Sequence, residues 1–131
     1  MTIDSRLCIS YFTIELRGPI PPESRAGIGA NVFGCDICQD VCPWNLRLSP
    51  QAEPPAPPPL EKLAALSEEE FRTVFRASAV KRARYTGFLR NVAIAMGNLG
   101  LEKFREPLQK MAQSPDSVVA EHARWGLERL Q

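Results

Sequence analysis

Three of the four cysteines lie within eight residues, at Cys35, Cys38 and Cys42, and a proline follows the last of them. The spacing C-x2-C-x3-C-P matches the end of the bacterial iron–sulfur run C-x2-C-x2-C-x3-C-P. Thiols so close in sequence reach one metal centre only from a tight, irregular loop, whose backbone N–H groups offset the charge of the sulfurs. The first cysteine of the full run would fall at Val32, so Cys8 is the one other thiol available.

These cysteines favour an iron–sulfur cluster over the other uses of thiols. The Cys-Pro ending is typical of cluster-binding loops, whereas a four-thiolate zinc site would need a second C-x2-4-C pair. The N-terminal residues show no export signal, so we expect a cytoplasmic protein, and there clustered cysteines are more often metal ligands than disulfides. Zinc and structural thiols remain alternatives. The predicted metal ligands are Cys8, Cys35, Cys38 and Cys42.

Length and charge set limits on the architecture and the partners. A chain of 131 residues is the size of one ordinary domain. Sixteen Lys and Arg against fifteen Asp and Glu leave a net charge of +1, so an electrostatic partner must be sought in local clusters. No run approaches 18 apolar residues, so no membrane span is expected. Six prolines between Pro50 and Pro59 predict a stiff linker that divides the chain.

Residue patterns predict a mainly α fold. Residues 7–16 are rich in β-branched and aromatic side chains, which favour an extended segment or one short strand, and a helical turn is expected near residues 23–26. Ser67 and Glu70 form a capping box that begins a helix. Apolar spacing predicts further helices over 87–98 and 101–113, and Ser114 is expected to cap the last one. The last two helices should be antiparallel.

The predicted organisation has three parts. Residues 1–49 form an irregular ferredoxin-like iron–sulfur segment, residues 50–60 the proline-rich linker, and residues 61–131 an antiparallel helical domain that resembles HEAT-type hairpins. The alternative for residues 61–131 is a small irregular helical bundle. We expect His122, the only histidine, to pack in the core with Trp125 or to hydrogen-bond there, and we expect Asn91 and Asn98 to share one helix face.

A basic segment is the second candidate site. Residues 71–90 contain six Arg and Lys and no acid, on a nearly neutral chain. Tyr85 and Phe88 lie among these cations and could stack on an unpaired base or sugar. A charge run is more often a solvated helix face, which is the alternative reading. The predicted nucleic-acid-binding residues are Lys81, Arg82, Arg84 and Arg90.

Three stretches together resemble the epoxyqueuosine reductase family. They are Cys8-Ile9-Ser10-Tyr11 with Thr13-Ile14-Glu15, the run from Gly34 to Asn45, and Arg90-Asn91-Val92-Ala93-Ile94-Ala95-Met96-Gly97-Asn98, in the family's order. The resemblance implies reduction of epoxyqueuosine to queuosine in tRNA, with cobalamin and two 4Fe-4S clusters. It covers only the C-terminal part of the family, without the cobalamin domain, its catalytic aspartate and an upstream cysteine run.

The resemblance also implies roles for individual residues. Cys8, Cys35 and Cys38 would bind one cluster with a cysteine of the missing run, while Cys42 would complete the other cluster. Cobalamin would lie beside Ser10, Asp36 and Ile37, although Ser10 and Asp36 could equally serve only the loop backbone. No catalytic residue is expected in this chain.

We therefore expect a monomeric fragment of a longer or split reductase that is inactive alone. Its partners would be the tRNA anticodon stem-loop, the missing domain in cis or trans, and an electron donor. The four cysteines could instead share one cluster. The alternative functions are a ferredoxin-like electron carrier and a zinc-stabilised RNA-binding module.

Overall fold

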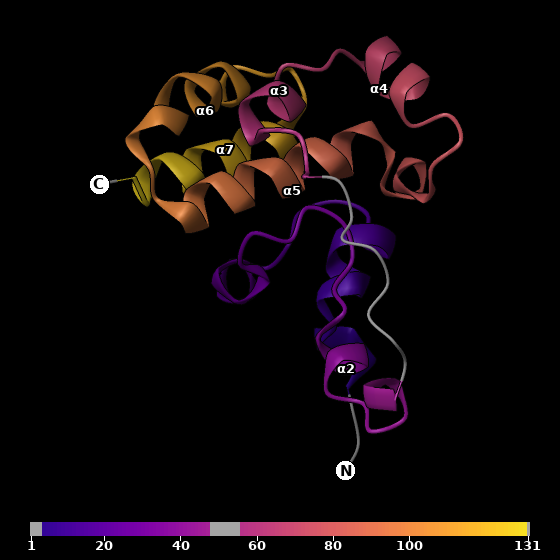
Figure 1. The fold of residues 1–131 in the computed structure, drawn as a ribbon. Coiled ribbons are helices and arrows are strands. Elements are labelled where there is room, and N and C mark those ends of the chain that lie inside the picture. The colour runs from indigo at the N-terminus through magenta and orange to yellow at the C-terminus, as the bar shows by residue number, and fades with distance from the viewer. Residues whose placement is uncertain (1–3, 48–55, 131) are drawn as a thin grey trace.

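The computed structural model describes residues 4–47 and 56–130, which form helices and irregular segments without any β-strand (Figure 1). Residues 4–47, here called the cysteine arm, extend away from a helical part made of residues 56–130. Within these residues no helix is long and apolar enough to span a membrane. Most of the predicted proline linker, residues 50–55, lies outside the described residues.

The helical part contains five α-helices, among the residues described: α3 (Leu60–Ala64), α4 (Glu68–Val74), α5 (Arg84–Leu99), α6 (Arg105–Ala112) and α7 (Ser117–Glu128). The capping box is confirmed, since Ser67 Oγ accepts from the Glu70 N–H while the Glu70 carboxylate accepts from the Ser67 N–H. Gly100 ends α5 in the left-handed conformation at φ 63°, as expected of a C-terminal glycine. Helix α3 was not predicted, because five residues are too few to show a helical period.

The N-terminus of α7 differs from the prediction. Asp116, not Ser114, is the N-cap, because its carboxylate accepts from the N–H groups of both Val118 and Val119. The other Asp116 oxygen accepts from the Thr86 hydroxyl at 2.7 Å, which ties the start of α7 to α5. Ser114 instead accepts from the Asp116 N–H in the preceding turn.

The predicted extended segment at residues 7–16 is wrong. Tyr11–Glu15 form a turn of π-helix within a helical stretch that starts at Ile9. Thr13 donates its hydroxyl to the Ile9 carbonyl at 2.8 Å, a bond that suits a helical threonine. Phe12 is buried with Ile20, Ile28 and Ile94. Tertiary burial of this face therefore outweighs the β-propensity of the residues. The rest of the cysteine arm contains α1 (Pro22–Arg25), close to the expected turn, and α2 (Ile37–Asp40).

Helix α5 is the centre of the molecule, and every residue from 87 to 97 is buried. A helix buried all round needs neighbours on each side. One side, with Phe88, Val92 and Met96, packs into the main core with α4, α6 and α7, and the other meets the cysteine arm. Gly97 of α5 lies so close to α7 that a Cβ there would be 2.7 Å from the Gly126 Cα. Glycine at this crossing permits the close approach of the two helices.

Candidate functional site

The structure brings the two cysteine-bearing stretches of the arm side by side. Cys8 directly precedes the helical stretch of residues 9–15, and Cys35 precedes α2. Ser10 donates its hydroxyl to the Cys35 carbonyl at 3.4 Å. Thr13 Oγ1 accepts from the Gly34 N–H at 2.9 Å, and Gly34 turns the chain there with a φ of 72°. Two hydrogen bonds thus hold the Cys8 stretch against the start of the cysteine loop.

The cysteines are free thiols at differing exposure. Cys38 is exposed, while Cys8, Cys35 and Cys42 are half-buried, and none forms a disulfide. Within residues 4–47 and 56–130, no three Cys, His, Asp or Glu side chains are grouped to hold a metal ion. The fold therefore joins the two backbone stretches, whereas the grouping of Cys8, Cys35 and Cys38 on one cluster stays a prediction.

The thiol of Cys8 lies in a setting that favours the thiolate. The Tyr11 N–H is the main cause of a lowered pKa at Cys8, and the Ser10 N–H adds to it, while burial opposes the shift less strongly than the Tyr11 N–H favours it. A thiolate is the form that binds metals. Backbone N–H groups turned toward sulfur are also typical of cluster ligands.

Polar side chains on α5 hold the irregular backbone of the arm in place. Asn91 Nδ2 donates to the carbonyls of Thr13 and Val32, both at 2.8 Å. Asn98 Nδ2 donates to the carbonyls of Arg25 and Gly29, both at 2.9 Å. An irregular segment leaves carbonyls that no helix or strand can satisfy, so buried donors from α5 replace those bonds. The shared face of the two asparagines, expected from their spacing, is the face that meets the arm.

Arg90 belongs to the same group of donors, so the prediction that it contacts nucleic acid directly is wrong. Its side chain is only 1% exposed. All five of its N–H groups donate within the protein: three to the carbonyls of Phe12, Leu16 and Gly18, and two to Asn91 Oδ1. Burial, with the nearby charge of Arg17, lowers the pKa of Arg90 to about 10.

The other predicted nucleic-acid-binding residues are exposed around the start of α5. Lys81 and Arg82 lie on the 3-10 turn Ala79–Ala83, and Arg84 is the first residue of α5. Arg82 forms an ion pair with Glu15 of the arm. Lys81 donates to the Arg76 carbonyl at 3.4 Å. The structure therefore leaves three of the four predicted cations exposed: Lys81 and Arg84 line one pocket, and Arg82 faces the arm.

The structure places the two predicted stacking residues differently. Phe88 is 2% exposed and packs against Phe71 and Phe75, with ring centroids 5.1 and 5.3 Å away. Tyr85 is half-buried, and its hydroxyl donates to the Leu66 carbonyl at 2.6 Å. Stacking of a base on Phe88 is therefore wrong, because its side chain is buried in the core, whereas stacking on the half-buried Tyr85 stays a prediction.

The residues expected beside cobalamin lie near the cysteines. Ser10 joins the two cysteine stretches as described above. Asp36 is exposed and makes no side-chain cap to α2, while its carbonyl accepts from the N–H groups of Gln39 and Asp40. Ile37 is 61% exposed. The Asp36 side chain is thus exposed to solvent, and it makes no hydrogen bond to the part of the loop that the structure describes.

Exposed apolar side chains surround this end of the arm. Five large ones are each 61–76% exposed: Leu7, Ile37, Val41, Trp44 and Leu46. We call this set the apolar end of the arm. Four of its members lie in or just after α2 in the sequence, whereas Leu7 lines a pocket with Glu23 and Ser24 of α1. Helix α2 lies at the end of the arm away from the helical part in Figure 1. Apolar surface concentrated in one region, rather than scattered singly, indicates a contact with another polypeptide or a ligand.

His122 is a structural residue, as expected. It is fully buried, its Nε2 accepts from the Ile20 N–H at 3.1 Å, and its Nδ1 lies 2.7 Å from the Val118 carbonyl. These bonds require a neutral ring with the proton on Nδ1. Burial lowers the pKa of His122 to about 4. Arg25, also buried, pairs with Glu121 beside it, so α7 contributes a second polar contact to the arm.

Comparison with known proteins identifies the class. Residues 1–45 match the family described as 4Fe-4S double cluster binding domain, and this range contains all four cysteines. The cysteine-containing third of the chain is thus similar to domains that bind 4Fe-4S clusters. Curated relatives indicate the family to which the chain is similar. An epoxyqueuosine reductase of Pseudomonas aeruginosa is 42% identical over 97% of this chain, and one of Escherichia coli is 38% identical over 96%.

A solved structure agrees with these relatives. A crystal structure of epoxyqueuosine reductase with an epoxyqueuosine-modified tRNA-Tyr stem loop superposes with a TM-score of 0.82 over 93% of this chain, at 29% identity. Over nearly its whole length the chain is therefore related to the epoxyqueuosine reductases, which confirms the resemblance drawn from the three motifs. It spans 37% and 35% of the two curated relatives and 34% of the crystallised chain.

Proposed function

We propose that this chain is the iron–sulfur and tRNA-contacting part of an epoxyqueuosine reductase, which reduces epoxyqueuosine to queuosine in tRNA. The observation that carries the proposal is the match to such reductases along 96–97% of the chain, cysteines included. A tRNA substrate and thiolate ligands both favour a cytoplasmic location. The chain alone would be inactive, since its relatives are almost three times as long.

The arm would supply ligands to two clusters. Cys8, Cys35 and Cys38 would bind one 4Fe-4S cluster and Cys42 the other, with the remaining ligands from polypeptide outside these 131 residues. The hydrogen bonds of Ser10 and Thr13 to the loop, and the lowered pKa of Cys8, support this assignment. A bound cluster supplies one-electron transfer. The donors of α5 keep the cysteine backbone rigid, which suits a site that must hold several sulfurs in fixed geometry.

The apolar end of the arm would meet the remaining polypeptide, in cis or in trans. Cobalamin, held mainly by that polypeptide, would supply the reduction chemistry beside Ser10, Asp36 and Ile37. Exposure of Ile37 at 61% and of Val41 at 71% supports a contact there. The helical part, whose HEAT-like character remains a prediction, would hold Lys81, Arg82 and Arg84 toward the tRNA backbone.

Anaerobic reconstitution with iron and sulfide tests the iron–sulfur assignment. The chain is mixed with the missing two-thirds of a relative, and bound iron, sulfide and visible absorption are measured. We expect Cys8→Ser and Cys35→Ser to remove the same cluster, and Cys42→Ser to remove the other. Ser24→Ala, on α1 of the same arm, is the control and should remove neither. Uptake of zinc without iron or sulfide would contradict the proposal and favour a zinc-stabilised module.

The enzymatic part of the proposal has its own assay. The mixture, with a chemical reductant and cobalamin, should convert epoxyqueuosine in a tRNA anticodon stem-loop to queuosine, as measured by mass spectrometry of the nucleosides. Clusters that are reduced and reoxidised without any conversion of the nucleoside would instead favour an electron carrier.

A further inference from the structure

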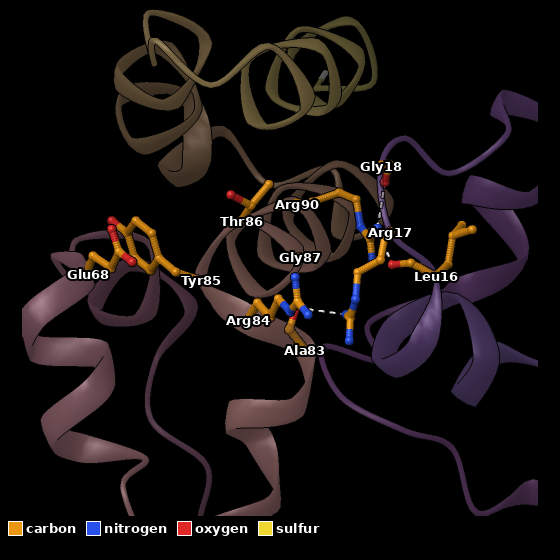
Figure 2. Close-up of a pocket in the computed structure, with 10 residues that line it drawn as sticks. All are labelled: Leu16, Arg17, Gly18, Glu68, Ala83, Arg84, Tyr85, Thr86, Gly87 and Arg90. Atoms are coloured by element: carbon orange, nitrogen blue, oxygen red, sulfur yellow. Dashed lines mark hydrogen bonds between the residues drawn. The ribbon is translucent and has the colours of Figure 1, made fainter.

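A pocket of about 320 Å³ opens where the cysteine arm meets the start of α5 (Figure 2). Residues 16–18 of the arm form one wall, and residues 83–87 form the other. Arg17, Arg84 and Arg90 are the three cations among its lining residues, and Glu68 is the one acid. Glu68 already pairs with Arg72 at 2.6 Å. The lining therefore carries an excess of positive charge.

Arg90 places a buried charge beside this pocket that no carboxylate neutralises. Its acceptors are carbonyl and amide oxygens, which are neutral. Among the described residues no Asp or Glu forms an ion pair with it. Buried charges in proteins are normally paired, because an isolated one loses its hydration without compensation. An anion in the adjoining pocket would supply the missing negative charge.

Arg17 and Arg84 supply donors that an anion could reach. Both are exposed. Arg17 is held by carbonyls from both parts of the chain, with bonds to Ile14 of the arm at 3.1 Å and to Arg82, just before α5, at 3.0 Å. For the Arg84 guanidinium, the described residues contain no hydrogen bond or ion pair. One arginine is therefore pre-positioned, and the other is free to close on a ligand.

The backbone of Arg84 is itself unusual. Its φ of 61° and ψ of 165° fall in a region that is essentially restricted to glycine. Such a conformation costs about 1–3 kcal/mol, and the rest of the fold must sustain it. Here it directs a long cationic side chain into the lining of the pocket. The strain accompanies the charge cluster and does not by itself define a ligand.

We propose that this pocket binds one phosphate group of the RNA backbone. The inference rests on the proposed function, and it assigns a particular anchoring point for the tRNA. RNA fits better than a small acid because a second pocket, of about 440 Å³, adjoins the first through Glu68, Arg84 and Tyr85. Arg72, Arg76 and Lys81 also line it, and Glu68 pairs with Arg72, so its lining carries an excess of positive charge. A row of cations in neighbouring pockets suits a polyanion.

Gly87 offers a precise test of the pocket. A Cβ built at Gly87 would lie 3.6 Å from Nη2 of Arg90, an ordinary contact distance, so alanine fits without displacing anything. The added methyl would screen the buried charge from the pocket. Alanine also favours helix over glycine by about 1 kcal/mol, so the variant should be at least as stable as the parent. Weakened binding by Gly87→Ala would therefore not reflect unfolding.

The experiment uses the 131-residue chain with two probes. Inorganic phosphate is titrated while the backbone N–H and arginine Nε resonances are followed by NMR, and a fluorescent RNA anticodon hairpin is titrated by anisotropy. Arg84→Gln should weaken hairpin binding about tenfold. It should also reduce by about 1 the magnitude of the slope of the logarithm of the binding constant against the logarithm of the salt concentration. Gly87→Ala should weaken the binding of both inorganic phosphate and the RNA hairpin. The controls are Arg124→Gln, an exposed cation on α7, and Gly27→Ala, where a Cβ meets nothing within 4 Å.

Each outcome decides between the proposals. Phosphate that causes saturable chemical-shift changes at residues 84–87 supports the phosphate site, provided that Arg84→Gln abolishes these changes and Arg124→Gln does not. Hairpin binding that both site variants leave unchanged overturns this inference while the reductase proposal stands. Phosphate binding without any hairpin binding overturns the RNA occupant. Loss of cluster binding in the reconstitution above affects only the reductase proposal.

Discussion

The strained backbone of Arg84 leads to a prediction in which stability and binding change in opposite directions. Replacing Arg84 with glycine removes a steric cost of about 1–3 kcal/mol at φ 61° and ψ 165°. Glycine also lowers the free energy of unfolding by about 0.5–1 kcal/mol, because it gives the unfolded chain more conformational freedom. The net gain in the free energy of unfolding is therefore about 1 kcal/mol, which for a chain of this size raises Tm by roughly 3–6 °C.

Arg84→Ala is the matched comparison, because it removes the same guanidinium but keeps a Cβ in the strained region. We expect thermal and urea unfolding to show Arg84→Gly about 1 kcal/mol more stable than Arg84→Ala. Both variants should weaken binding of the RNA hairpin equally, since binding depends on the charge. At an ordinary helical position glycine is less stable than alanine. If Arg84→Gly is likewise less stable than Arg84→Ala, the backbone at residue 84 is not strained, and the predicted gain in stability is refuted.

Three further predictions concern stability. Lowering the pH from about 6.5 to 4 should cost about 3 kcal/mol through His122, because the unfolded chain binds a proton there that the folded chain, with a pKa of about 4, excludes. His122→Gln should show a flatter pH dependence of urea unfolding, and an unchanged dependence would contradict this role. Gly97→Ala should destabilise the fold by about 1–3 kcal/mol, since its Cβ would lie 2.7 Å from the Gly126 Cα, whereas Gly27→Ala should have little effect in the same assay. Ser67→Ala should lower the unfolding free energy by about 1 kcal/mol through loss of the capping box, and an equal Tm would refute that contribution.

Local patterns predicted most of the helical part correctly. The capping box at Ser67 and the apolar residues of α6 act over a few neighbouring residues, so their effect is visible in sequence. The predicted strand at residues 7–16 failed because Phe12 and Thr13 are buried against partners far along the chain. No local pattern contains that information.

The candidate sites divide in the same way. Cysteine spacing indicated an iron–sulfur segment, and residues 1–45 match a 4Fe-4S double cluster binding domain, which supports that interpretation. The excess of cations in residues 71–90 was also visible, but their individual roles were not. Arg84 is exposed beside a pocket, while Arg90, six residues further along, is buried against the arm. A helix turns a side chain toward core or solvent according to its neighbours, which composition does not reveal.

The sequence by itself determined the chemistry this chain can offer: thiols at the spacing of cluster ligands, a basic segment, and helices with defined ends. These depend on residue types and short spacings along the backbone. Only the tertiary structure decided that Arg90, Asn91 and Asn98 hold the carbonyls of the cysteine arm, and that Arg17 joins Arg84 at one pocket. Those contacts join residues about 60 to 80 positions apart, so they exist only once the two parts of the chain have packed together.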